Sequence, residues 1–254
     1  MKLNRVKTGI SGLDEMLGGG FLAETANLIE GAPGTGKTTF GMQFIYNGIM
    51  QHQEPGLIIT FEQFPEQFYQ IASNFGWNFL DLERRGLLKI VMTSPEVSRI
   101  DLKRVDGIIE HVIHELGIKR VMIDSISHFS RLTQDPIQLR ELRFAFLNAF
   151  KRHGITTILT NESQALLGEA QGNDTIGFIV DSYLILRYVE IESTMRKALL
   201  VLKMRGTSHA KDIRQYDITA QGIQIQSKFA GQSGILSGHP HQMTDSFVKA
   251  FVKP

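Results

Sequence analysis

The sequence contains no cysteine. This absence excludes disulfide bonds, thiolate catalysis and cysteine-ligated metal sites, and it is typical of proteins from a reducing compartment. The sequence also lacks any apolar stretch close to the roughly 18 residues that cross a bilayer. No apolar run follows the basic residues of its first segment, MKLNRVKTGISGLDE, so this segment does not resemble a secretory signal. We therefore expect a cytoplasmic protein that does not enter a membrane.

An excess of charge of one sign is missing as well. The 27 basic and 26 acidic residues give a formal net charge of +1, and there is no basic tail. Proteins that bind duplex DNA usually carry a basic stripe, because phosphate neutralisation supplies much of their affinity. Basic pairs do occur, but each lies among acids or on an amphipathic helix, where a solvated face is the simpler explanation. These pairs are Arg84 with Arg85, Arg140 with Arg143, and Lys151 with Arg152.

The first two thirds of the chain alternate short apolar runs with amphipathic stretches. The runs are apolar on both faces, which is typical of parallel strands covered by helices on both sides. We expect strands at 26–30, 57–62, 87–92, 119–124 and 156–161, and helices at 38–50, 65–75, 101–117 and 137–153. The predicted fold class is therefore α/β, with a mainly parallel sheet flanked by helices.

The pattern changes after Gly172. The pieces SYLILRYVEI, MRKALLVLKMRG, RQYDIT and GIQIQS are strand-like and separated by short polar turns, so we expect antiparallel hairpins at one edge of the sheet. There is no internal repeat and no interior linker. A chain of 254 residues can build one good-sized core. We expect a single domain over residues 1–237 and a tail over 238–254.

A glycine-rich segment, Gly31 to Thr38, lies between the first strand and the first helix and fits G-x-x-x-x-G-K-[ST]. A chance match in a chain of this length has odds of about 1%, given ordinary glycine usage. In such a loop the backbone N–H groups and the helix N-terminus surround phosphate oxygens. Lys37 would reach the terminal phosphates and the Thr38 hydroxyl would bind Mg²⁺. We expect contacts with ATP from Gly34, Thr35, Gly36, Lys37, Thr38 and Thr39.

Polar residues at the ends of three other strands are candidates for the same site. Asp124 ends a buried strand and could hold Mg²⁺ through water, although it could also be a turn aspartate. Glu62 ends the second strand, where a carboxylate could contact Mg²⁺ and deprotonate the attacking water, although it could also face solvent. Its neighbour Gln63 cannot act as a base. Asn161 closes the fifth strand and could sense the γ-phosphate or simply begin a turn.

Several segments in this order resemble the KaiC family, a branch of the RecA-like ATPases. They are TGISGLDEMLGGG, GAPGTGKTT, ITFEQ, NFGWNF, VMIDS, YVEI and KMRGTSH. The resemblance covers about residues 5 to 237, and the second half looks most like the second of KaiC's two ATPase domains. It implies a RecA-like core and a ring, usually a hexamer, that holds ATP between neighbouring subunits and serves as a slow regulatory switch.

The resemblance also gives a role to the segment KMRGTSH. Taken alone, this segment reads as a solvated basic turn. In the family's pattern, Lys203 and Arg205 resemble residues that point at the γ-phosphate held by the adjacent subunit, where an arginine finger stabilises developing charge. His209 and Lys211 are further candidates for phosphate contacts by the same resemblance.

The chain departs from the family in three ways. KaiC has two tandem ATPase domains, whereas this chain has one. The family often has paired glutamates where this chain has Glu62 and Gln63, which puts any role of a second carboxylate in doubt. KaiC's second domain phosphorylates adjacent Ser and Thr residues, but the aligned positions here are Gly177 and Phe178, which carry no hydroxyl. We therefore expect no phosphorylation cycle of that kind.

Two other functions remain open as alternatives. A RecA-class DNA recombination ATPase would form filaments and show DNA-stimulated hydrolysis, and a non-hydrolysing scaffold would assemble on ATP without consuming it. A protein-bound transition metal is not expected. His111 and His114 with Glu115 lie on an amphipathic helix without an apparent further ligand, and His239 and His241 lie in the predicted tail.

Overall fold

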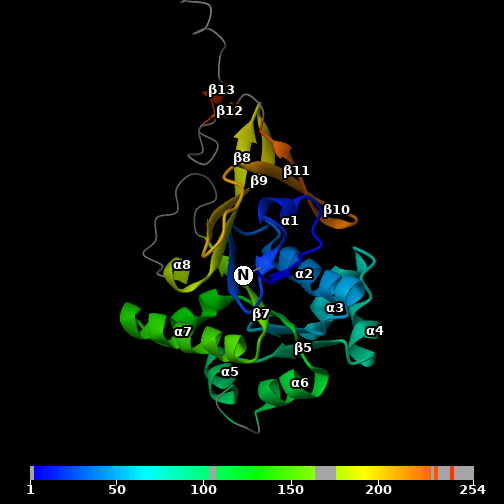
Figure 1. Cartoon of the computed structure of the whole chain (residues 1–254), viewed down its shortest axis with the longest axis vertical. Coiled ribbons are helices and arrows are strands. Elements are labelled where there is room, and N and C mark those ends of the chain that lie inside the picture. Colours follow the sequence, from blue (N-terminus) through cyan, green and yellow to red (C-terminus); the bar gives the residue numbers. More distant parts are fainter. Residues whose placement is uncertain are drawn as a thin grey trace, which may run out of the picture.

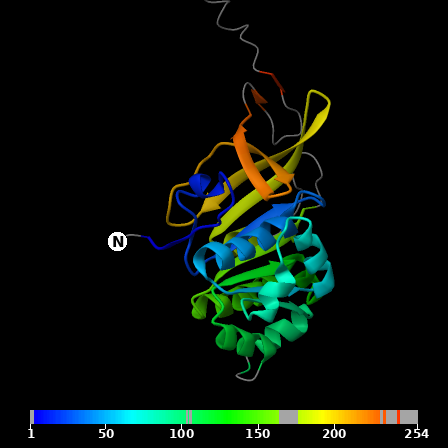
Figure 2. The same ribbon diagram turned by 90° about the vertical axis from the view of Figure 1, so that its right-hand side faces the viewer.

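A central sheet with helices on both faces forms the body of the molecule (Figure 1, Figure 2). The computed structural model describes residues 3–102, 104, 107–163 and 176–229, together with the backbone of 232–233 and 241–242. Among these residues the main sheet has nine strands. In chain order they are β3 (Ala26–Gly31), β4 (Gly56–Thr60), β5 (Leu88–Met92), β6 (Arg120–Asp124), β7 (Thr156–Glu162), β8 (Ser182–Ile191), β9 (Thr194–Met204), β10 (Arg214–Thr219) and β11 (Gly222–Lys228).

The helices and the shorter strand pairs surround this sheet. The helices are α1 (Leu13–Met16), α2 (Lys37–His52), α3 (Pro65–Ser73), α4 (Phe79–Arg84), α5 (Pro95–Asp101), α6 (Ile108–Leu116), α7 (Pro136–Arg152) and α8 (Ile176–Ile179), with the 3-10 helix η1 (Ile126–Arg131). Two separate antiparallel pairs join β1 (Arg5–Val6) to β2 (Phe21–Leu22), and β12 (Gln232–Ser233) to β13 (His241–Gln242).

The sheet has a parallel part and an antiparallel part. Its strand order is β11-β10-β9-β8-β3-β7-β6-β4-β5. All pairings from β8 to β5 are parallel. The pairings β8–β9, β9–β10 and β10–β11 are antiparallel, and these strands form the upper part of Figure 1. The predicted α/β class, with hairpins at one edge, is therefore confirmed.

Successive side chains of the parallel strands pack into two different cores, because neighbouring residues of a strand point to opposite faces. In β4, Ile58 joins the core under α2 and α3, whereas Leu57 and Ile59 join the core under α6 and α7. In β6, Met122 joins the core under α2 and α3, and Val121 joins the core under α6 and α7. Both faces are covered by helices, which is why these strands read as uninterrupted apolar runs.

The predicted helix 101–117 is wrong as a single element. The structure ends α5 at Asp101 and begins α6 at Ile108. The Asp101 carboxylate accepts hydrogen bonds from the backbone N–H groups of Ile108, at 2.8 Å, and Ile109. A carboxylate that caps a new N-terminus favours a break there, while the apolar spacing continues across it and mimics one helix.

Two other predictions concern where the second strand ends and where the domain ends. The strand expected at 57–62 ends at Thr60, so Glu62 lies two residues beyond β4. The predicted boundary between domain and tail, at residues 237 and 238, lies outside the described residues.

Within the described part of the chain, none of the helices combines the length and apolar character needed to cross a membrane.

Two phenylalanines of α7 provide a matched test of the core. Phe150 is fully buried and packs edge-on against Phe146 with ring centroids 5.3 Å apart, whereas Phe144 is 51% exposed. We expect Phe150→Ala to lower the free energy of unfolding by about 3–5 kcal/mol. We expect Phe144→Ala to change it by only about 0.5 kcal/mol. Urea unfolding of both variants checks this, and equal losses would contradict the assigned core.

Candidate active site

The glycine-rich loop leaves the sheet at the carboxyl edge of its parallel strands. Gly31 ends β3 and pairs with Glu162 of β7 on one side and Leu186 of β8 on the other. The loop then turns directly into α2, which begins at Lys37. The unpaired N–H groups and the positive end of the helix dipole therefore lie against the loop, which suits an anion.

Two glycines of the loop occupy positions that other residues would strain. Gly34 has a φ of +77°, and a Cβ there would lie 2.7 Å from Tyr188 Oη. Gly36 has a φ of +94°, and a Cβ there would lie 2.6 Å from Ile218 Cδ1. A left-handed backbone without room for a side chain allows only glycine. The loop shape thus depends on β8 and β10 as well as on its own sequence.

Tyr216 of β10 also supports the loop, and the sequence analysis did not single it out. Its hydroxyl donates a hydrogen bond of 2.6 Å to the backbone oxygen of Thr35, and the side chain is fully buried. Burial raises the pKa of this hydroxyl above its ordinary value, so it stays a donor. An isolated tyrosine in a predicted edge strand carries no sequence signal for this contact.

Lys37 folds back over the loop. Its Nζ donates a hydrogen bond of 3.1 Å to the Ala32 backbone oxygen. Burial lowers the pKa of the Lys37 ammonium below its ordinary value, and the carboxylates of Glu162, Asp124 and Glu30 oppose this shift only in part. A partly buried cation beside exposed backbone donors is an attractive position for a polyanion.

Thr38 and Asp124, which the sequence suggested as Mg²⁺ ligands, meet directly. The Thr38 hydroxyl donates a hydrogen bond of 2.8 Å to Asp124 Oδ2. Thr160 of β7 donates to the other carboxylate oxygen and so orients it. A hydroxyl oxygen and an oriented carboxylate side by side are a donor set that suits a hard divalent cation.

Glu62 lies near this edge but faces outward. Thr60 pairs with Asp124 across β4 and β6, so the residues after Thr60 begin beside the site. The Glu62 side chain is 67% exposed, and its Oε2 lies 3.4 Å from Nε2 of the mostly buried His128. A water-activating carboxylate at this edge is compatible with that position, and its role stays a prediction.

Asn161 is engaged within the sheet. Its Nδ2 donates to Glu30 Oε2 at 3.1 Å, and its Oδ1 accepts from the Ser127 hydroxyl at 3.1 Å. Glu30 also lies 3.6 Å from the Arg187 guanidinium. A direct contact between Asn161 and a phosphate would use the second N–H of this buried amide or require the amide to exchange a partner. The network of Asn161 with Glu30, Ser127 and Arg187 was not predicted, because its four members come from four separate segments.

The basic segment that begins at the end of β9 lies away from the loop of the same chain. Lys203 Nζ donates to the backbone oxygens of Gly177, at 2.8 Å, and Val180, at 2.7 Å. Its pKa is lowered by burial and then by the charge of Arg205. Arg205 is exposed and donates to the Phe178 backbone oxygen.

The two further candidates from this segment make no hydrogen bond or ion pair with the loop among the described residues. His209 Nδ1 lies 2.9 Å from the Ala210 backbone oxygen, and Ala210 N–H donates to Met16 at the end of α1. Lys211 is exposed. The structure therefore brings Lys37, Thr38 and Asp124 together, while the segment from Lys203 to Lys211 stands apart from them.

The lowered pKa of Lys37 predicts a dependence of stability on pH in nucleotide-free protein. Below the folded-state pKa the ammonium is charged in both states, and burial then costs stability. This cost is relieved as the pH rises through the folded-state pKa toward the ordinary value of 10.5. Lys37→Met should thus gain stability over the wild type near neutral pH, and the difference should shrink in alkali. Urea unfolding from pH 7 to 10 tests this, and a pH-independent difference would contradict it.

Comparisons with known proteins agree with this geometry. The family model described as "ATPase: KaiC" matches residues 6–229. The chain is 35% identical over 246 residues to the circadian clock protein KaiC3 of Synechocystis sp., which covers 96% of this chain and 48% of that protein. It is 36% identical over 242 residues to the circadian clock oscillator protein KaiC of Prochlorococcus marinus, covering 95% of this chain and 48% of the relative.

A third relative gives the same proportions. The chain is 36% identical over 241 residues to the circadian clock oscillator protein KaiC of Thermostichus vulcanus, covering 94% of this chain and 46% of that protein. The chain thus spans about half the length of the curated relatives that it matches. Its mainly parallel sheet, flanking helices and antiparallel strands are those of a RecA-like core. The chain belongs to the KaiC family of ATPases.

Proposed function

We propose that this chain binds ATP with Mg²⁺ and hydrolyses it slowly in a ring of identical subunits, as a regulatory switch for a protein partner. The observation that carries the proposal is the 2.8 Å contact between the Thr38 hydroxyl and Asp124 beside Lys37. It joins the start of α2 to the end of β6 at the one edge where the glycine loop opens. Family membership supports ATP as the ligand.

The residues at this edge fit the nucleotide and the ion. The backbone from Gly34 to Thr39 offers donors to the phosphates, and Lys37 would exchange the Ala32 carbonyl for phosphate oxygens. Thr38 and Asp124 would hold Mg²⁺, the aspartate directly or through water. The bound ion would neutralise charge on the terminal phosphates. Because Gly34 and Gly36 carry no side chains, the loop backbone can come close enough to the phosphates for these contacts.

Glu62 is the proposed base for the attacking water. It follows β4 at the edge where Asp124 ends β6, and its exposed carboxylate would leave its contact with His128 to turn toward a bound phosphate. Glu162 is the alternative carboxylate at this edge, since it pairs with Gly31 and acts electrostatically on Lys37. The two glutamates form a matched pair, because each can be changed to glutamine without altering its volume.

The strand register supports a contribution of Lys203 and Arg205 to a neighbouring subunit's site. Asn27 of β3 pairs with Ser182 of β8, and Ser182 pairs with Met204 of β9. Met204 therefore lies level with Asn27, four residues before Gly31, which corresponds to about 13 Å along the strand. The basic pair is thus displaced toward the other edge of the sheet from its own loop, and we propose that the phosphate it contacts belongs to a neighbouring chain.

Such an arrangement defines the assembly that we propose. An interface that uses the loop of one subunit and the basic pair of the next is heterologous, and repetition closes it into a ring. We propose a hexamer, from the resemblance to KaiC. The absence of hydroxyls at Gly177 and Phe178 argues against a KaiC-type phosphorylation cycle. The switch would then be set by ATP turnover alone.

Phosphate release tests the hydrolytic function. With Mg²⁺·ATP, the wild type should release phosphate slowly and Lys37→Ala should release none above background. Glu62→Gln should lose about a hundredfold to a thousandfold in rate while retaining ATP. Glu162→Gln is the control and should lose much less. If only Glu162→Gln loses activity, Glu162 rather than Glu62 is the base.

The same assay separates the two alternative functions. A wild type that assembles on ATP without releasing phosphate would be a scaffold. A wild type whose phosphate release is stimulated by DNA would be a recombination ATPase.

Mixed rings test the contribution of Arg205 across the interface. Lys37→Ala and Arg205→Ala should each be inactive alone, because one lacks the loop cation and the other the neighbour's cation. In an equimolar mixture, about a quarter of head-to-tail interfaces combine an intact loop with an intact arginine. Activity should recover to about that fraction, whereas Lys37→Ala mixed with the double variant should stay inactive. Full activity of Arg205→Ala alone would exclude the role.

A further inference from the structure

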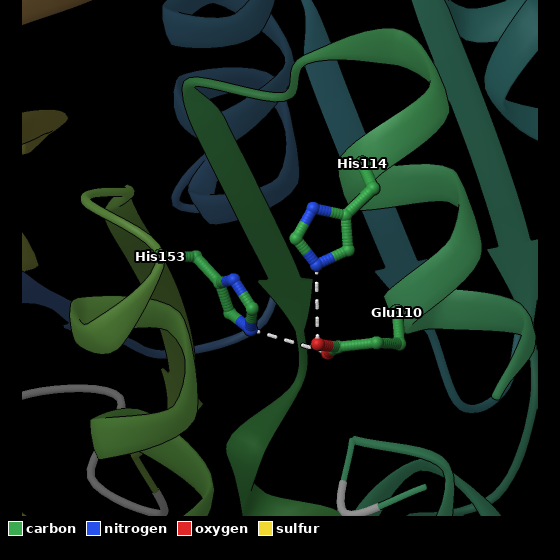
Figure 3. Close-up of side chains that lie close together, drawn as sticks. All are labelled: Glu110, His114 and His153. Atoms are coloured by element: carbon green, nitrogen blue, oxygen red, sulfur yellow. Dashed lines mark hydrogen bonds and ion pairs between the residues drawn. The ribbon is translucent and has the colours of Figure 1, made fainter. Parts of the chain in front are cut away.

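Two side chains of α6 and one from the end of α7 converge away from the glycine loop. Glu110 and His114 lie one turn apart on α6, and His153 follows the last residue of α7 (Figure 3). Both imidazoles point their Nε2 atoms at the one carboxylate. The candidate ligand atoms of all three residues lie within 4.8 Å of one another.

The separations of these atoms match a metal coordination sphere. His114 Nε2 lies 3.3 Å from Glu110 Oε1, and His153 Nε2 lies 3.1 Å from Glu110 Oε2. Zinc held tetrahedrally at about 2.0–2.1 Å places neighbouring ligand atoms about 3.3 Å apart. The two imidazole rings meet edge-on with centroids 5.2 Å apart, an arrangement that leaves both nitrogens on the carboxylate side.

The carboxylate has a partner missing. Glu110 Oε2 is shielded from solvent and accepts no well-aligned hydrogen bond, although His153 Nε2 is near. The His153 imidazole forms an ion pair with this oxygen only when it is protonated, and a buried carboxylate oxygen without an aligned donor is costly. The side chains of Glu110 and His153 are only 17% and 19% exposed, whereas that of His114 is 67% exposed. The cluster is thus closed on the protein side and open to solvent beside His114.

We propose that Glu110, His114 and His153 bind one zinc ion, with water in the fourth position. Two imidazole nitrogens and one carboxylate oxygen form a donor set that suits Zn²⁺ and similar transition metals, whereas Mg²⁺ favours oxygen ligands. The site would therefore take a different cation from the one proposed at Thr38 and Asp124. Bound zinc would supply the positive partner that the buried Glu110 Oε2 lacks.

The location indicates a clamp between helices. α6 ends just before β6 begins, and α7 ends just before β7 begins, so the cluster lies at the amino edge of these strands. The proposed Mg²⁺ ligand Asp124 is at the other end of β6, about 13 Å from the first residue of this five-residue strand. The ion would join α6 to α7 and stabilise this face of the sheet without touching ATP.

The sequence analysis considered His111, His114 and Glu115 together and expected no metal there, and the proposed ligands share only His114 with that set. His111 and Glu115 face solvent on α6, with side chains 73% and 60% exposed and their closest polar atoms 3.2 Å apart. They do not belong to the cluster. His153, the ligand that completes it, comes from another helix. His111 is for this reason the matched control, since it lies on α6 next to Glu110 but outside the proposed site.

Cobalt titration of the full-length, untagged protein tests the site after removal of nucleotide and metals. We expect one Co²⁺ per chain with the intense visible absorption of four-coordinate cobalt, displaced by one equivalent of Zn²⁺. Zn²⁺ should also raise the melting temperature, since it binds only the folded chain. His153→Gln and His114→Gln should each weaken binding by about tenfold or more, as even outer-shell changes cost at least that much.

Two control variants make the outcome decisive. His111→Gln and Thr38→Ala should bind Co²⁺ like the wild type, because neither changes a ligand of this site. The proposal is overturned if the wild type shows no stoichiometric binding, or if His153→Gln binds Co²⁺ as tightly as His111→Gln. The variants should retain the wild-type circular dichroism spectrum, and their melting temperatures without metal serve as the folding reference.

Discussion

The candidate active site depends on one hydrogen bond, from the Thr38 hydroxyl to the Asp124 carboxylate. It joins the first turn of α2 to the end of β6, across the intervening β7. The contact is possible because parallel strands end at a common edge, where Gly31, Asp124 and Glu162 finish three neighbouring strands. Apolar packing on both faces keeps this edge in register, so the core and the site are consequences of the same strand order.

The opposite edge of the sheet has a different character. Lys203 and Arg205 lie there beside α8, and the cluster of Glu110, His114 and His153 lies at the amino ends of β6 and β7. One edge is thus suited to an anionic nucleotide with a hard cation. The other carries the groups that we propose for a neighbouring subunit and for a softer metal. The length of the parallel strands keeps the nucleotide site apart from the groups at the opposite edge.

Local patterns were sufficient for most of the fold and for half of the site. Apolar runs identified the strands, and the loop from Gly31 to Thr38 follows from its spacing of glycine, lysine and threonine. The break between α5 and α6 was missed because apolar periodicity continues across it, while the Asp101 cap acts through two backbone N–H groups. Tyr216 was missed because its contact with Thr35 crosses most of the chain.

The sequence by itself determined the fold class, the glycine loop and the family, because these are written in short-range spacing and in ordered motifs. Only the tertiary structure decided which distant groups share a space. In the structure Asn161 lies between Glu30 and Ser127. The Glu62 carboxylate lies near His128. The imidazole next to His114 is that of His153 and not that of His111. The physical reason is that side-chain contacts between elements depend on strand order and helix rotation, which local periodicity does not encode.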